Sequence, residues 1–245
     1  MTFSKPFSHP PSSYHRYEHA RFEMRRRFLR FLIARIGFTL FAKLDRVEGL
    51  ENVPAHGPAI VMINHIAFVD PIAVMHVLPR NIIPMAKEEV YNYPLIGIFP
   101  RIWGVIPVRR EEIDRQALHQ ALDILKAGEI VLVAPEGTRH NNLQDAKEGV
   151  AYLASRSGVP VVPTAIDGSI GFPSIRPSSR WREPGIVIRF GRAFQYQSAL
   201  GRPNRAQLRQ MTDEAMYALA ALLPEHRRGA YADLSKASQE TINWV

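Results

Sequence analysis

Short apolar runs alternate with longer amphipathic segments along most of this chain. The apolar runs are five to eight residues long, and Gly, Pro or Asn residues separate them from their neighbours. The longer segments repeat apolar residues every three or four positions, which is typical of helices packed on one face. The pattern predicts strands at 59–63, 82–86, 103–108, 129–134, 159–166 and 186–190, and helices at 71–78, 114–126, 147–157 and 206–223.

This alternation of strands and helices predicts an α/β fold. Parallel strands need a crossover connection, and a helix between successive strands supplies it. The chain has 245 residues, enough to bury one full core. We therefore expect a single domain with a mixed, largely parallel sheet flanked by helices. We place this domain at 48–228, with an N-terminal amphipathic helical membrane arm at 1–47 and a C-terminal tail at 229–245; the chain after Pro224 is expected to be irregular.

The N-terminal arm carries most of the net charge. The whole sequence has a formal net charge of +8, and residues 1–30 hold seven Lys or Arg against two Glu. Residues 28–44 then set Arg30 and Arg35 among aromatic and aliphatic side chains. Their longest uncharged run, 36–42, is much shorter than the ~20 apolar residues that span a bilayer. This pattern predicts a helix that lies in the interface of an anionic membrane.

The sequence of the arm leaves other interpretations open. The main alternative is a helix packed on its own domain, with its arginines in solvent. Nucleic-acid binding lacks a recognisable module, and a secretory signal lacks a small-residue cleavage site. An organelle transit peptide fits poorly with Glu18 and Glu23. We expect a peripheral or monotopic protein on the cytoplasmic face of a bacterial cell membrane, with no nucleic-acid partner.

A histidine and an aspartate flank the junction between the first predicted strand and the helix after it. Asp70 and Pro71 are residue types favoured at a helix start, with Asp70 as the N-cap. His65 and Asp70, five residues apart, would point in different directions on one helix, but across a turn they can meet. A carboxylate bonded to one imidazole nitrogen fixes the tautomer and leaves the other nitrogen as a general base. On this segment alone, a structural histidine and a capping aspartate remain an alternative.

Further polar clusters follow the next predicted strands. Lys87 follows the second strand, Arg109 and Arg110 follow the third, and Pro135-Glu136-Gly137-Thr138-Arg139 follows the fourth. Binding sites in open α/β sheets collect where strands end and helices begin. Each charge alone would be a solvated surface group, and the glycine alone a turn residue. Together they place a base–acid pair beside several cations, which suits a phosphate-bearing substrate.

These segments resemble the glycerolipid acyltransferases, specifically the 1-acyl-sn-glycerol-3-phosphate (lysophosphatidic acid) acyltransferase family. Asn64, His65 and Asp70 match the first family motif, an Asn-His pair followed by four residues and Asp. The stretch 87–110 resembles the second motif, 135–139 matches the third, Pro-Glu-Gly-Thr-Arg, and 159–163 is similar to the proline-containing fourth. Any one motif is weak evidence, whereas four in order over roughly 50–228 are specific.

The resemblance implies a membrane-associated O-acyltransferase. It would move a fatty acyl group from a thioester to the free hydroxyl of lysophosphatidic acid, giving phosphatidic acid. His65 is expected to be the general base and Asp70 to orient it. The acceptor's phosphate is expected to bind at Lys87, Arg110, Glu136, Gly137, Thr138 and Arg139, where Glu136 orders the cations or holds a headgroup hydroxyl. The acyl donor would be acyl-CoA or acyl carrier protein (ACP), with no permanently bound cofactor and no metal.

Some features leave the substrate open. Ala67, Ala134 and His140 depart from residues common in the family, which puts the acceptor in question more than the reaction. Alternatives are transfer to glycerol 3-phosphate or another lysolipid, and a non-catalytic lipid-binding protein of the same fold. A lipase-like hydrolase is disfavoured because 167–171 lacks the first glycine of G-x-S-x-G. Phe68, Phe99, Ile102 and Trp103 are candidates for an acyl-chain groove, and equally for plain core.

Metal and thiol chemistry find no support in the sequence. The chain has no cysteine, which excludes disulfides, a thiol nucleophile and thiolate metal sites. His65 and Asp70 have no third residue at a spacing that would complete a zinc site.

Overall fold

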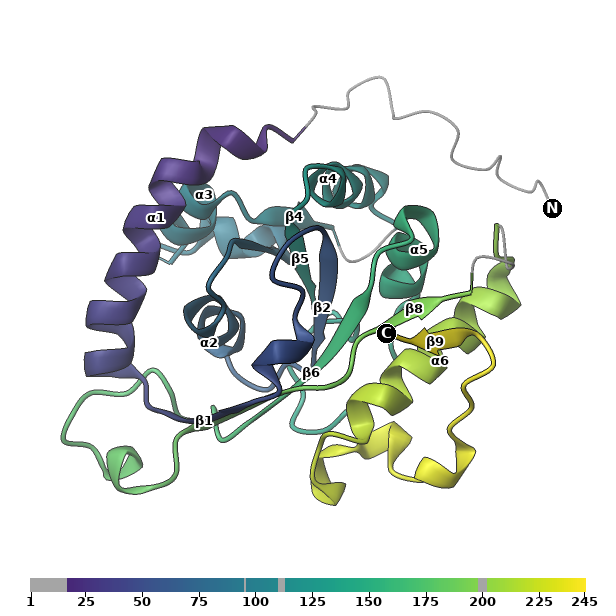
Figure 1. The fold of residues 1–245 in the computed structure, drawn as a ribbon. Coiled ribbons are helices and arrows are strands. Elements are labelled where there is room, and N and C mark those ends of the chain that lie inside the picture. The colour runs from purple at the N-terminus through teal and green to yellow at the C-terminus, as the bar shows by residue number, and fades with distance from the viewer. Residues whose placement is uncertain (1–16, 95, 110–112, 198–201) are drawn as a thin grey trace.

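A nine-stranded sheet lies at the centre of the computed structural model, which describes residues 17–94, 96–109, 113–197 and 202–245 (Figure 1). Its strand order is β1-β7-β6-β2-β5-β3-β4, and β8 joins β6 to β9. The strands are β1 (Leu44–Glu48), β2 (Ala59–Ile63), β3 (Ile82–Lys87), β4 (Ile106–Val108), β5 (Ile130–Val133), β6 (Val161–Asp167), β7 (Ile186–Phe190), β8 (Phe194–Tyr196) and β9 (Ile242–Trp244).

Strand direction brings the ends of five strands to one edge. β6, β2, β5, β3 and β4 run parallel, so their carboxyl ends meet there. β7 is antiparallel to β6, and β1 is parallel to β7. β1 therefore begins at the same edge, which we call the carboxyl edge. The predicted mixed, largely parallel sheet is confirmed.

Helices cover both faces of the sheet (Figure 1). Ile60 and Met62 of β2 pack in an apolar cluster with α4, α5 and α6, whereas Val61 and Ile63 pack in a second cluster with α2 and α3. A strand buried on both faces is expected to be apolar throughout, as β2 is. The α-helices are α1 (Glu23–Leu32), α2 (Asp70–Val77), α3 (Ile98–Trp103), α4 (Arg115–Lys126), α5 (Gly149–Ser157) and α6 (Arg205–Ala220).

Shorter helical segments connect these elements. A 3₁₀ turn, η1 (His19–Phe22), precedes α1, and a π-helix, η2 (Ile33–Phe41), continues it. The other 3₁₀ turns are η3 (Leu50–Asn52), η4 (Glu88–Asn92), η5 (Ser179–Arg182), η7 (Glu225–Arg227), η8 (Gly229–Tyr231) and η9 (Leu234–Lys236).

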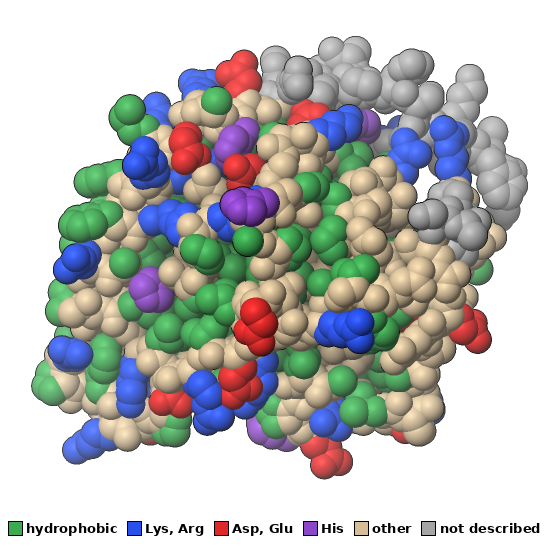
Figure 2. Space-filling model, in the orientation of Figure 1, with side chains coloured by type: hydrophobic (Ala, Val, Ile, Leu, Met, Phe, Trp, Pro, Cys, Tyr) green, Lys and Arg blue, Asp and Glu red, His purple; other side chains and the backbone are tan. Residues whose placement is uncertain are grey.

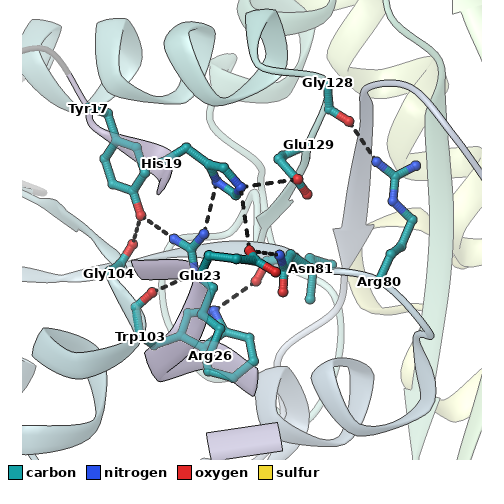
Figure 3. A network of polar contacts seen from close by, with 11 residues as sticks. Tyr17, His19, Glu23, Arg26, Arg80, Asn81, Trp103, Gly104, Gly128 and Glu129 are labelled. Carbon is teal, nitrogen blue, oxygen red and sulfur yellow. Dashed lines mark hydrogen bonds and ion pairs between the residues drawn. The ribbon is translucent and has the colours of Figure 1, made fainter. Parts of the chain in front are cut away.

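The helical arm, formed by η1, α1 and η2 (residues 19–41), crosses the outside of the face covered by α2 and α3 (Figure 1). Arg26 is fully buried and attaches α1 to the domain (Figure 3). Its guanidinium donates to the Trp103 carbonyl at 2.8 Å and to His19 Nδ1 at 2.9 Å. His19 Nε2 in turn lies 3.1 Å from a carboxylate oxygen of Glu129. Residues 1–16 of the predicted arm lie outside the described residues.

Among the described residues, no helix is both long and apolar enough to cross a bilayer.

The predicted strand at 103–108 is partly wrong. Trp103 ends α3, Gly104 follows in the left-handed conformation with φ of 76°, and the strand begins only at Ile106. Trp103 belongs to the core, where its indole N–H donates to the Ile82 carbonyl at 2.9 Å. The apolar character that suggested a strand therefore comes from a buried helix end.

The prediction of an irregular chain after Pro224 is also wrong. This segment contains three 3₁₀ turns and β9, which pairs with β8 in an antiparallel manner. Glu214 on α6 holds the segment, because its buried carboxylate accepts hydrogen bonds from the Thr241 N–H at 2.9 Å and the Ser238 hydroxyl at 2.9 Å. The other predicted strands and helices are present, with ends that differ by at most three residues.

Candidate active site

His65 and Asp70 meet at the carboxyl edge, in the turn between β2 and α2. Asn64 anchors this turn to the neighbouring strand β6, because its side chain donates to the Ile166 carbonyl at 2.8 Å and accepts from the Ile166 N–H at 2.7 Å. The next residue, His65, has its Nδ1 3.0 Å from Asp70 Oδ2. The sequence prediction that these two residues meet across a turn agrees with this geometry.

Asp70 is not the N-cap that the sequence suggested. It is the first residue of α2, and its side chain turns back toward the preceding residues. Its Oδ2 also accepts hydrogen bonds from the backbone N–H groups of Ile66 and Ala67, both at 2.7 Å. A carboxylate held by two N–H groups is a fixed acceptor, so His65 Nδ1 carries a hydrogen and donates it. His65 Nε2 then carries the lone pair, and the side chain is 19% exposed.

Glu136 contacts this pair from the loop after β5, three residues beyond the last residue of that strand. It is buried and accepts hydrogen bonds from the backbone N–H of Gln144, at 2.9 Å, and from that of His65. Burial raises the pKa of the Glu136 carboxyl to about 7, against the two hydrogen bonds, which lower it. These contacts with the backbone position His65 and the loop that follows Glu136.

Arg139 and Thr138 are exposed in the same loop, after a turn at Gly137 with φ of 74°. The His140 N–H donates to the His65 carbonyl at 2.9 Å, which ties this loop to the turn that holds His65 and Asp70. The Arg139 guanidinium has no hydrogen-bond or ion-pair partner among the described residues, so it can bind an anion.

Lys87 ends β3 at the same edge, where its ammonium pairs with Glu89 at 2.7 Å. To bind a phosphate, Lys87 has to exchange this partner. Arg109, at the end of β4, lies 3.5 Å from Glu88. Arg110, the predicted phosphate ligand beside it, lies outside the described residues.

Arg227, which the sequence did not single out, holds the Arg139 loop from the far end of the chain. Its guanidinium donates to Asp167 at 3.1 Å and to the Asn141 carbonyl at 2.8 Å. The Arg227 carbonyl also accepts the Leu143 N–H at 2.9 Å. In the sequence, Arg227 lies three residues after Pro224, in a segment predicted to be irregular, and no motif there indicates a role for it.

The four candidates for an acyl-chain groove differ in burial and in position. Trp103 is fully buried, and Phe99 stacks on it with ring centroids 5.7 Å apart. Ile102 is partly buried in the same helix. Phe68 is partly exposed in the turn between His65 and Asp70, so of these four side chains it lies nearest to the two along the chain.

Relatives of known name match this chain. A chloroplast 1-acyl-sn-glycerol-3-phosphate acyltransferase of Arabidopsis thaliana is 33% identical over 153 residues, which cover 59% of this chain and 42% of the relative. The 1-acyl-sn-glycerol-3-phosphate acyltransferase of Bacillus subtilis is 33% identical over 124 residues, which cover 50% of this chain and 62% of the relative. The chain thus spans about half the length of the curated relatives it matches.

The fold has a counterpart of known structure. The crystal structure of the 1-acyl-sn-glycerophosphate acyltransferase PlsC from Thermotoga maritima matches with a TM-score of 0.56 and 24% identity. The match covers 88% of this chain and 83% of that chain. The sequence model of the family described as Acyltransferase matches residues 45–167, half of the chain, a range that contains His65, Asp70 and the 135–139 motif. The predicted resemblance is confirmed, and this chain belongs to the acyltransferase family.

Proposed function

We propose that the protein is a membrane-associated O-acyltransferase that acylates the free hydroxyl of lysophosphatidic acid to give phosphatidic acid. The observation that carries the proposal is the His65–Asp70 pair, joined at 3.0 Å at the edge that bears Arg139, with no partner for the second imidazole nitrogen among the described residues. The relatives named 1-acyl-sn-glycerol-3-phosphate acyltransferases support this choice of acceptor.

The acyl group is transferred directly from the sulfur of the thioester to the hydroxyl oxygen of the acceptor, with the thiolate as the leaving group. His65 Nε2 takes the proton of the acceptor hydroxyl while that oxygen attacks the thioester carbonyl and forms the new C–O bond. The tetrahedral intermediate then collapses, the C–S bond breaks, and the thiolate leaves with the proton that His65 held. Asp70 stabilises the imidazolium in between without taking the proton. A positioned general base of this kind accelerates a reaction by ~10²–10⁴.

Arg139 is the first candidate for the acceptor's phosphate. It is exposed, has no partner among the described residues and belongs to a loop tied to His65 through His140. A guanidinium can donate two parallel hydrogen bonds to a phosphate, which fixes orientation as well as charge. Lys87 can bind the same phosphate once its ion pair with Glu89 is broken. The role of Arg110 as a phosphate ligand stays a prediction from the sequence.

The helical arm supports membrane association. Met24 is 83% exposed and Phe28 is 61% exposed, on a helix that also carries several arginines. Figure 2 shows apolar and basic side chains together along the side of the molecule where the arm lies in Figure 1. Large exposed apolar surfaces mark interaction sites, and the added arginines favour an anionic bilayer. The cytoplasmic face of a bacterial membrane stays a prediction.

The acceptor and the donor are tested with purified protein on anionic vesicles. Lysophosphatidic acid, glycerol 3-phosphate and lysophosphatidylcholine are offered in turn with labelled acyl-CoA or acyl-ACP. We expect product with lysophosphatidic acid and far less with the other two acceptors. A preference for glycerol 3-phosphate would replace the acceptor but not the reaction. No acyl transfer with any pair would contradict the proposed enzyme.

A further inference from the structure

The segment between β6 and β7 (residues 168–185, the β6–β7 excursion) presents isoleucines and arginines to solvent. Ile175 is 74% exposed, Ile170 is also exposed, and Arg176 and Arg182 lie on the surface. The excursion contains three Arg and one Glu, so its net charge is positive. An exposed aliphatic side chain next to surface cations is the combination found on proteins that bind anionic membranes.

The excursion has a defined internal structure that holds these side chains outward. Arg180 lies inside it, where its guanidinium donates to the carbonyls of Gly168, Ile170 and Pro184 and covers the Phe172 ring at 4.4 Å. Phe172 itself is buried. One arginine therefore closes the excursion around its own small core, and the exposure of Ile175 is a property of its folded form.

The excursion is continuous with the end of the helical arm. The Ser174 N–H donates to the Phe41 carbonyl at 2.7 Å, and Lys43 Nζ donates to the Glu183 carbonyl at 2.9 Å. Phe41 is itself partly exposed at the end of η2. In Figure 1 the excursion lies just beyond the lower end of the arm, and Figure 2 shows apolar and basic side chains on this corner as well.

We infer that the β6–β7 excursion is a second contact with an anionic phospholipid bilayer, with Ile175 inserted and Arg176 and Arg182 at the headgroups. This inference rests on the membrane association in the proposed function. If the arm were the single contact with the membrane, the whole protein could still roll about the axis of the arm. A second contact away from that axis fixes the orientation of the protein on the bilayer. Because the excursion follows the carboxyl end of β6, the two contacts turn the His65 edge toward the lipid.

An acidic protein is the other occupant to consider, because ACP also attracts arginines. The bilayer is favoured because Ile175, an aliphatic residue, is 74% exposed and because the surface continues the apolar end of the arm. An anionic bilayer can bury the apolar side chains in its interface and attract the arginines through its negative surface potential.

The absence of cysteine permits a direct test. Ile175→Cys gives a single labelling site, and Ala237→Cys gives a control, since Ala237 is exposed in the segment that Glu214 holds on α6, on the face of the sheet opposite the arm. Each variant of the full chain carries an environment-sensitive fluorophore and is mixed with phosphatidylglycerol vesicles. We expect a blue shift and quenching by brominated lipid at position 175 and neither at position 237. Ile175→Asp should weaken vesicle partition by roughly tenfold or more while leaving kcat on detergent-solubilised acceptor unchanged.

Three results would overturn the inference in distinguishable ways. Vesicle binding by the wild type with no change at position 175 would reject the second contact and leave the proposed function intact. No vesicle binding by the wild type would reject both the contact and the proposed membrane association. A signal at position 175 with ACP but not with vesicles would assign the surface to the protein that carries the donor.

Discussion

Asp70→Asn separates the negative charge of this side chain from its hydrogen bonds. Asp70 Oδ2 accepts from His65 Nδ1 at 3.0 Å and from the N–H groups of Ile66 and Ala67 at 2.7 Å. An asparagine oxygen in that position accepts the same three bonds. Its NH₂ group then replaces Asp70 Oδ1, a buried atom without a hydrogen-bond partner among the described residues. The turn is therefore preserved and the charge is lost.

The loss of charge has a calculable effect on the reaction. In the transition state His65 becomes an imidazolium, and charges about 4 Å apart attract by about 4 kcal/mol at an effective dielectric constant of about 20. Removing this attraction lowers kcat by about 10³-fold, with little change in the KM for the acceptor. The unpaired amide lowers the free energy of unfolding by about 1–3 kcal/mol, because a buried donor is left without an acceptor.

The assay is steady-state transfer of a labelled acyl group to lysophosphatidic acid, with circular dichroism and Tm as checks on folding. Asp70→Ala is the control, since it also leaves the two backbone N–H groups unpaired and should lose more stability than Asp70→Asn. A folded Asp70→Asn protein whose kcat stays within about tenfold of the wild type would refute the reasoning. Asp70 would then hold the shape of the turn without stabilising charge on His65.

Three further predictions concern the loop beside His65. Arg139→Ala raises the KM for lysophosphatidic acid by roughly 10–100-fold at nearly constant kcat, measured by initial rates, because a charge-assisted hydrogen bond is lost; a changed kcat alone would contradict this. The pKa of Glu136 is raised from 4.5 to about 7 in the folded protein, so its stabilising effect is complete below pH 4.5 and is lost as the pH rises through about 7. That loss is about 3 kcal/mol, and urea unfolding between these pH values should reveal a decline that Glu136→Gln flattens. Arg227→Ala lowers kcat/KM by roughly tenfold, whereas Arg227→Lys recovers part of it by keeping the charge near Asp167 without the second donor; equal loss in both variants would contradict the role of the charge.

The sequence predicted elements that local pattern determines. β2 and β7 have the predicted bounds because the flanking residues delimit them: β2 lies between Pro58 and Asn64, and β7 lies between Gly185 and Gly191. Residues 103–105 do not belong to the predicted strand at 103–108, because Trp103 is the buried last residue of α3 and Gly104 follows in the left-handed conformation. β9 has only three residues, so its pairing with β8 is decided by tertiary contacts rather than by its own sequence.

In the candidate site, too, contacts within one turn could be predicted from the sequence, and contacts between distant segments could not. The contact of His65 with Asp70 could be predicted because both residues belong to one turn. The backward direction of the Asp70 carboxylate could not, since capping and bonding to Ile66 and Ala67 suit the same residue type. Arg227 lies 86 positions from Asn141, and no local pattern indicates which loop a distant arginine will reach.

The proposed mechanism depends above all on His65 as the general base of acyl transfer. The most direct test compares wild type with His65→Ala on anionic vesicles that contain lysophosphatidic acid, with labelled acyl-CoA and acyl-ACP as donors. We expect phosphatidic acid from the wild type and none above background from a His65→Ala protein with an intact circular dichroism spectrum. Equal product from both proteins would contradict it.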